Sequence, residues 1–201
     1  MTLAVEQFVK PVKSVESPTP HRFTREEYYR LGELGMFEGQ RVELIEGEIV
    51  DMAPQLTPHA MATSLALQAL QKAFPGYLVR IQMPLSFGAS EPEPDLAIVT
   101  GQPRDYPTGH PQTALLVVEV SESTLRYDRT RKASLYARAG IKDYWVLNLV
   151  KNCLEVMRGP VEDGNAEFGW RYASVTTLKS GDLVSPLAKP QAVIAVTDLL
   201  P

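Results

Sequence analysis

The feature that most restricts the fold of this chain is the segment at residues 115–149, which reads LLVVEVSESTLRYDRTRKASLYARAGIKDYWVLNL. It opens on an uninterrupted apolar run, which is typical of a strand that is covered on both faces. A helical pattern follows, and a second apolar strand starts at Asp143. A strand–helix–strand unit of this length predicts a right-handed crossover between parallel strands.

The helix predicted inside this segment places a basic residue on its apolar side. We predict Asp128 as the N-cap and Gly140 as the C′ residue. Three- and four-residue spacing then puts four side chains on one side: Lys132, Leu135, Tyr136 and Ala139. Before the helix, Glu119 interrupts the first strand. A charge there is costly unless it is paired or binds a metal or ligand.

Composition narrows the class of protein. A chain of 201 residues is long enough for one domain with a real core. We expect residues 1–20 to form a flexible arm, because they are polar, contain prolines and lack periodicity, and residues 21–201 to form a single domain. No apolar run approaches the roughly 20 residues that span a bilayer, and no signal-peptide core is present. These features predict a cytoplasmic protein without a membrane partner.

Cysteine, histidine and charge exclude other classes. The single cysteine, Cys153, rules out an intrachain disulfide and fits a reducing cytosol; we expect it to be packed and inert. Three scattered histidines make a structural zinc site improbable. The net charge of −4 argues against a broad, nonspecific grip on nucleic acid, although a local basic groove stays possible.

The N-terminal half predicts a helix followed by a hairpin. Thr24 and Glu27 have the spacing of a capping box, so we expect a short helix from there to Gly35. Residues 41–52, RVELIEGEIVDM, predict a hairpin with Glu46 in its turn. Glu43 lies inside the first strand and is therefore the better candidate for a site, although a solvent-facing strand residue is an equally good interpretation.

A second helix and two strands follow. Thr57 is the predicted N-cap of a helix that ends before Pro75, and His59 in its first turn is either exposed or, as the minority interpretation, site-facing. Residues 77–87 predict an edge or bulged strand, because Pro84 interrupts them. Asp95 then precedes a short apolar strand at residues 96–99. Beyond residue 150 we expect two antiparallel strands, at 153–157 and 168–175, then one or two edge strands and an apolar turn.

Three charged residues fall on neighbouring elements: Asp95, Glu119 and Lys132. If the strands of Asp95 and Glu119 pair, both carboxylates can face one point, where oxygen ligands suit a hard divalent cation. Lys132 can reach back from the helix to orient an activated water or to neutralise phosphate charge. As bare spacing the pattern is weak, because acidic residues and lysines are frequent.

Four segments, in this order, resemble the Uma-two family of endonucleases, which belongs to the restriction-endonuclease-like PD-(D/E)XK superfamily: VELIEGE, TPHAMATSLALQAL, EPEPDLAIV and residues 115–147. The resemblance covers about residues 23–149 and is weaker to the end. It implies an α/β (α+β) fold with a mixed central sheet, flanking helices and extra antiparallel strands. It also implies a phosphodiesterase site that uses Mg²⁺ or Mn²⁺.

The resemblance also assigns residues to that site. Asp95 matches the aspartate of the Pro-Asp motif and Glu119 matches the second acid, so these two would bind the metal. The superfamily usually places a lysine two positions after that acid, where this chain has Ser121. The resembling family supplies the lysine from the next helix, and Lys132 fits. Glu43 matches the family's early glutamate and is a further candidate acid.

Gln82, Tyr136 and His59 complete the candidate site as supporting residues. The competing interpretation is that Glu119 pairs with Arg126 or Arg129, that Asp128 only caps a helix, and that Lys132 is solvated with its stem on the sheet. Without the resemblance we would favour this competing interpretation. With it, we expect a metal site at Asp95 and Glu119.

Two functions therefore follow from the sequence. The first is a metal-dependent endonuclease acting on DNA. The alternative is a non-catalytic module with the nuclease fold that binds DNA or self-associates through exposed strands or the apolar tail. A homodimer is expected in either case. The sequence carries no base-reading motif, so it does not predict which sequence is cut.

Overall fold

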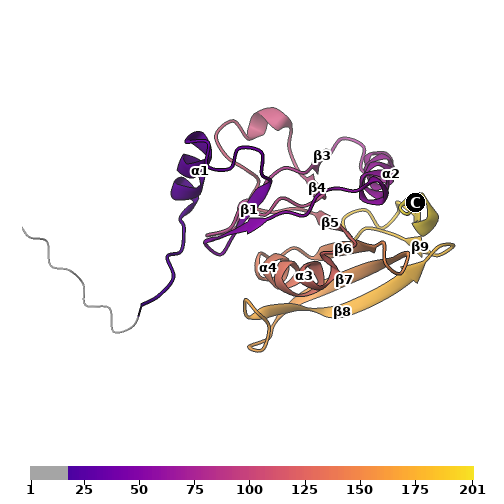
Figure 1. Ribbon diagram of the computed structural model, residues 1–201. Helices are drawn as coiled ribbons and strands as arrows, with labels where there is room; N and C mark the ends of the chain where they lie inside the picture. Colours follow the sequence, from indigo (N-terminus) through magenta and orange to yellow (C-terminus); the bar gives the residue numbers. More distant parts are fainter. Residues whose placement is uncertain (1–17) are drawn as a thin grey trace, which may run out of the picture.

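The computed structural model describes residues 18–201, and its centre is a six-stranded mixed sheet (Figure 1). The strands follow the order β3-β4-β5-β6-β7-β8. Their bounds are β3 Leu78–Ile81, β4 Leu96–Val99, β5 Leu116–Ser121, β6 Asp143–Asn148, β7 Cys153–Glu162 and β8 Trp170–Lys179. Only β5 and β6 run parallel. The predicted α/β (α+β) architecture, a mixed sheet flanked by helices, is confirmed. The predicted arm lies outside the described residues for positions 1–17.

The two parallel strands are joined by a helix, as predicted. This helix consists of α3 (Leu125–Tyr127), a π-helical turn (Asp128–Lys132) and α4 (Ala133–Arg138). The prediction that Asp128 is the N-cap is wrong, because the N-cap is Thr124, four residues earlier, and Asp128 lies inside the helix. Its carboxylate accepts hydrogen bonds from the hydroxyls of Ser121 and Thr124, both at 2.6 Å. Gly140 has the left-handed conformation expected after the helix.

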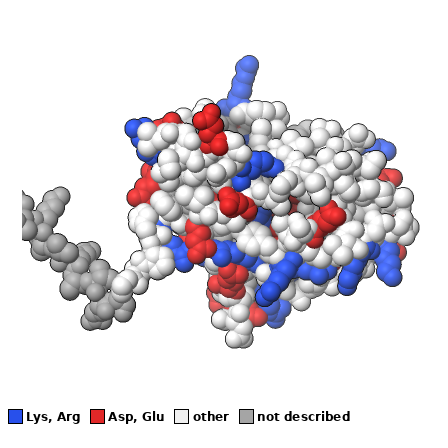
Figure 2. All heavy atoms as spheres, viewed as in Figure 1, with Lys and Arg blue, Asp and Glu red and all other residues white. Residues whose placement is uncertain are grey.

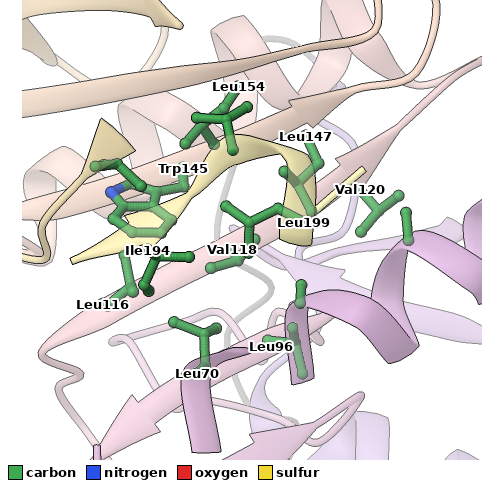
Figure 3. Close-up of a cluster of buried hydrophobic side chains, with 14 of the residues drawn as sticks. Leu70, Leu96, Leu116, Val118, Val120, Trp145, Leu147, Leu154, Ile194 and Leu199 are labelled. Atoms are coloured by element: carbon green, nitrogen blue, oxygen red, sulfur yellow. The ribbon is translucent and has the colours of Figure 1, made fainter. Parts of the chain in front are cut away.

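Alternation along the strands separates two apolar layers. Val118 and Val120 of β5 face a core that also includes α2 (Thr57–Ala73) and the C-terminal segment (Figure 3). That segment contains the short strands β9 (Leu183–Val184) and β10 (Ile194–Ala195), which pair with each other. Val117 faces the opposite core, under α4. Because side chains alternate, Glu119 projects to the α4 side together with Val117.

The N-terminal elements agree with the sequence in all but one detail. Helix α1 (Arg25–Glu33) begins with the predicted capping box, and the hairpin of β1 (Val42–Ile45) and β2 (Glu48–Asp51) turns at Glu46 and Gly47. Helix α2 differs by one position. Leu56 is its N-cap and Thr57 its first residue, without a side-chain cap.

Gly47 closes the turn of this hairpin under two constraints. Its φ is 75°, and a Cβ atom there would lie 2.8 Å from the Cβ of Arg22 and 3.1 Å from the carbonyl oxygen of Phe23. Gly39 has the same φ of 75° and no atom within 4 Å of its Cβ position. We expect Gly47→Ala to lower the free energy of unfolding by about 2–4 kcal/mol, and the matched Gly39→Ala by only about 1 kcal/mol. Urea denaturation measures both; equal effects would contradict the steric argument.

The remaining predictions concern the edges of the sheet. Strand β3 lies at an edge, as predicted, but it ends at Ile81, because Gln82 has a φ of 47°. The predicted strands near residues 153 and 168 are the long antiparallel pair β7–β8.

Cys153 is buried, as expected. Within residues 18–201, no helix has both the length and the apolar character needed to cross a bilayer.

Candidate active site

Asp95 and Glu119 meet because their strands are neighbours. Strand β4 pairs with β5 in an antiparallel register that puts Leu96 opposite Val118, so Asp95 and Glu119 occupy the next positions along each strand. The backbone N–H of Asp95 donates to Glu119 Oε2 at 3.3 Å, and the N–H of Val120 donates to Asp95 Oδ2 at 2.8 Å. Both residues are more than nine-tenths buried. The sequence prediction that these two acids face one point agrees with this geometry.

Lys132 reaches the same point from the helix. Its Nζ lies 3.0 Å from Glu119 Oε1 and 3.1 Å from Glu43 Oε2, and the residue is only 4% exposed. The Tyr136 hydroxyl, one helical turn further, donates to Glu119 Oε1 at 2.7 Å. The interpretation of Lys132 as a solvated residue is therefore wrong. So is the pairing of Glu119 with Arg126 or Arg129, because Arg129 pairs instead with Glu155.

Two supporting residues contact Asp95 from other elements. His59, in the first turn of α2, places Nε2 3.2 Å from Asp95 Oδ2. The expectation of an exposed His59 is wrong, and the minority interpretation of a site-facing histidine agrees with the structure. Gln82, just after β3, donates from Nε2 to Asp95 Oδ1 at 3.3 Å. Its left-handed backbone turns the chain at the edge of the sheet, next to Asp95.

Burial and pairing set the protonation of these groups. Burial raises the pKa of Glu119 to about 8, although the Lys132 ammonium opposes this rise. Burial also acts to lower the pKa of Lys132, but Glu119 and Glu43 outweigh it, so the lysine pKa lies well above its usual value. For Asp95, burial opposes the charged form, yet the hydrogen bond and charge of His59 keep the pKa below its usual value. The pKa values of these two neighbouring acids are thus shifted in opposite directions, that of Asp95 down and that of Glu119 up.

These side chains form one wall of a pocket of about 450 Å³. The other walls come from the β1–β2 hairpin, the loop before α2 and the start of the helix. Carboxylates outnumber cations in the lining: Glu43, Asp51, Glu93, Asp95, Glu119, Glu122 and Asp128 against Arg41, Lys132 and, when protonated, His59. The pocket therefore combines buried acids with an opening to solvent.

Comparison with known proteins places the chain in a family. The Uma2 family, whose description reads "putative restriction endonuclease", matches residues 25–197. The chain belongs to the Uma2 family. Its fold is similar to a crystal structure described as "a putative nuclease belonging to DUF820 from Anabaena variabilis ATCC 29413". The two share 14% identity with a TM-score of 0.65, over 88% of this chain and 97% of the other. No curated protein matches the chain.

Two of the further acids that line the pocket of this Uma2 protein are not exposed, and sequence reasoning missed both. Asp128 was assigned to a helix cap, whereas its buried carboxylate lines the pocket wall. Asp128 lies four residues before Lys132, and this helical spacing is the feature of the sequence that could have placed both on the pocket side. Glu93 also lines the pocket, and its N–H donates to Glu43 Oε2 at 3.1 Å. It lies two residues before Asp95, a spacing that puts both on one side of an extended chain.

The donor chemistry of the Uma2 pocket fits a magnesium ion better than zinc. Within residues 18–201, no three His, Cys, Asp or Glu side chains are arranged to enclose a metal by themselves. Mg²⁺ needs no such enclosure, because one or two carboxylates commonly hold it while waters and substrate oxygens supply the other ligands. Asp95 and Glu119 supply two carboxylates, and the excess of acids in the lining favours a cation. The residues present therefore fit the ion that the sequence predicts.

Proposed function

We propose that this protein is a metal-dependent endonuclease that hydrolyses phosphodiester bonds of DNA. The observation that carries the proposal is the convergence of Asp95, Glu119 and Lys132 at one solvent-accessible pocket. Membership of a family described as restriction endonucleases supports nucleic acid as the class of substrate. Asp95 and Glu119 would hold Mg²⁺ or Mn²⁺, and Glu43, through its contact with Lys132, would complete the catalytic group.

Each residue has a separate task in this proposal. A bound Mg²⁺ would acidify a water and polarise the phosphoryl group. Lys132 places a fixed positive charge beside Glu119, where it can stabilise the charge that develops on the phosphate. Tyr136 holds the Glu119 carboxylate by a hydrogen bond, and Glu43 holds the lysine ammonium by an ion pair. His59 and Gln82 restrain the two oxygens of Asp95.

Cleavage of supercoiled and linear plasmid DNA tests the proposal. We expect the wild type to cut in Mg²⁺ and not in EDTA, and Asp95→Ala to lose this cleavage, because the ion loses one of its two carboxylates. Asp51→Ala is a matched control, since Asp51 is an exposed acid at the pocket rim that contacts neither Lys132 nor Glu119. Equal residual cleavage by the wild type and Asp95→Ala would indicate a contaminating nuclease and reject the proposal.

One observation favours the non-catalytic alternative, in which the fold binds DNA or self-associates without hydrolysis. Lys132 already neutralises Glu119 and Glu43, so the acids are satisfied without a metal. Calorimetric titration with Mg²⁺ or Mn²⁺ separates the two functions. Clear binding that disappears in Glu119→Gln supports the nuclease, and no binding supports the alternative. The expected homodimer stays a prediction, which light scattering tests.

A further inference from the structure

The pocket contains one cation, Arg41, whose guanidinium makes no hydrogen bond to the acids of the site. Of the lining residues that can be positive, Lys132 and His59 both contact acids of the site. Arg41 is different, because its side chain is 40% exposed and donates no hydrogen bond to any residue between 18 and 201. Its single ion pair in that range, with Glu93 Oε2, is long at 3.9 Å. The Arg41 guanidinium is therefore available to a ligand.

A second unpaired donor belongs to a residue that lines the same pocket. The Tyr127 hydroxyl is buried, yet it has no hydrogen-bond partner among residues 18–201. Tyr127 lines the pocket beside Asp128, at the start of the π-helical turn. A buried hydroxyl without a partner costs free energy unless a ligand or water satisfies it. This unpaired group is an observation independent of the arginine.

The backbone holds Arg41 in place beside the acids. The Met52 N–H donates to the Arg41 carbonyl at 2.8 Å, which extends the hairpin ladder one residue beyond β1. Side chains two positions apart on an extended strand project to one face, so Arg41 and Glu43 share the pocket side. Glu43 contacts Lys132, which in turn contacts Glu119. The Arg41 guanidinium and the predicted catalytic residue Glu43 therefore project from the same short extended segment.

A phosphodiester is the ligand whose chemistry these two donors fit. The guanidinium fork matches two phosphate oxygens, and a phenol donates one further hydrogen bond. The protein has a net charge of −4, and the face shown in Figure 2 mixes acidic and basic side chains without a continuous basic surface. Affinity for a phosphate backbone would therefore depend on individual hydrogen-bond donors in the pocket more than on the electrostatic potential of the whole surface.

We propose that Arg41 and Tyr127 bind the phosphate group of the substrate strand, with Arg41 as the main anchor and Tyr127 as a second donor. This inference rests on the proposed nuclease function, because it assigns the substrate-binding residues of that pocket. The acids would hold the cation, and these donors would contact the oxygens of the phosphate. Neither residue contacts Asp95 or Glu119 through a hydrogen bond or ion pair within residues 18–201.

The test is fluorescence anisotropy of a labelled DNA duplex of about 20 base pairs with the full chain, in Ca²⁺, at salt between about 50 and 200 mM. We expect Arg41→Gln to weaken binding about tenfold and to reduce the slope of log affinity against log salt by about one. Arg41→Lys should retain the slope and part of the affinity. Tyr127→Phe should weaken binding about threefold without a change of slope. Arg30→Gln, at an exposed arginine of α1 that pairs with Glu33, should change neither quantity.

The outcomes separate this inference from the nuclease proposal. Wild-type affinity and slope in Arg41→Gln would overturn the inference, whether or not the wild type cuts DNA. So would a wild type that binds no duplex at all. Conversely, the wild type could bind DNA through Arg41 and yet not cut it in Mg²⁺. That result would support the phosphate-binding inference and reject only the proposal of hydrolysis. Thermal unfolding of each variant identifies any loss of DNA affinity that comes from misfolding. If Arg41→Gln misfolds, the affinity and salt slope of Arg41→Lys test the inference instead.

Discussion

Replacing Lys132 with methionine is expected to lower the free energy of unfolding by about 3–5 kcal/mol and to abolish cleavage. The Lys132 ammonium is the partner of two buried carboxylates, Glu43 and Glu119, at 3.1 and 3.0 Å. Methionine has a similar volume but leaves both acids without their cation in a pocket wall. Removing one partner of a buried ion pair costs more than the pair contributes, because the remaining charge stays desolvated. Urea denaturation measures the loss.

Two further variants test whether the loss of stability comes from the unpaired carboxylates. Lys72→Met makes the same substitution at an exposed lysine of α2 and should change stability by less than about 0.5 kcal/mol. The triple variant Lys132→Met, Glu43→Gln, Glu119→Gln removes the unpaired charges together, so it should recover most of the lost stability while cleavage stays absent. Wild-type stability in Lys132→Met would show that the acids are neutral without the lysine. Wild-type cleavage in that variant would remove Lys132 from the proposed chemistry.

The sequence located the principal residues because they lie next to strongly patterned elements. The apolar runs before Glu119 and after Asp95 predict strands, and once those strands pair, their neighbouring carboxylates must lie close together. Helical spacing put Lys132 and Tyr136 on one side, and both contact Glu119. Periodicity placed these side chains near one another, but only the family resemblance favoured a shared site over the competing interpretation, in which the same residues form a salt link, a cap and a solvated lysine.

The contacts that the sequence did not predict depend on long-range geometry. His59 starts a helix on the opposite face of the sheet from α4, and only the packing of α2 brings its ring to Asp95. The competing interpretation, in which Glu119 pairs with Arg126 or Arg129, is wrong because Arg129 projects to β7, where Glu155 accepts its hydrogen bonds. No sequence spacing distinguishes these arrangements, because tertiary packing decides which acid a given arginine meets.

The assignment of Asp128 failed for a different reason, which concerns helix geometry. Asp128 has good N-cap chemistry, and the regular α-helical period after it is uninterrupted in the sequence. The structure instead begins the helix at Leu125 and accommodates one wide π-helical turn from Asp128 to Lys132. Such turns carry one residue more than an α-helix would and are frequent at functional sites. Sequence periodicity at 3.6 residues does not reveal them.

Deleting Thr130 is therefore expected to inactivate the protein while the fold persists. Without the extra residue this stretch can form a regular α-helix, in which one residue corresponds to a rotation of about 100°. Leu135 and Tyr136 are fully buried, so their packing should hold α4 and Lys132 in place. The rotation then falls on the first turn. It moves the Asp128 carboxylate, one of the lining acids that favour a cation, out of the pocket. We expect cleavage to fall by at least about a hundredfold, because small misplacements in a site have effects of that size.

The substitution Thr130→Ala is the matched control for this deletion. Thr130 is exposed, and its hydroxyl donates only to the Arg126 carbonyl within residues 18–201, so removing the side chain alone should leave plasmid cleavage unchanged. Thermal unfolding of the deletion variant should remain cooperative, since the apolar contacts of α4 are kept. A deletion variant that cuts DNA at the wild-type rate would show that the π-helical turn does not position the site. If Thr130→Ala also loses activity, the effect comes from the threonine side chain. If only the deletion variant loses activity, the π-helical turn is what aligns Asp128 with Lys132.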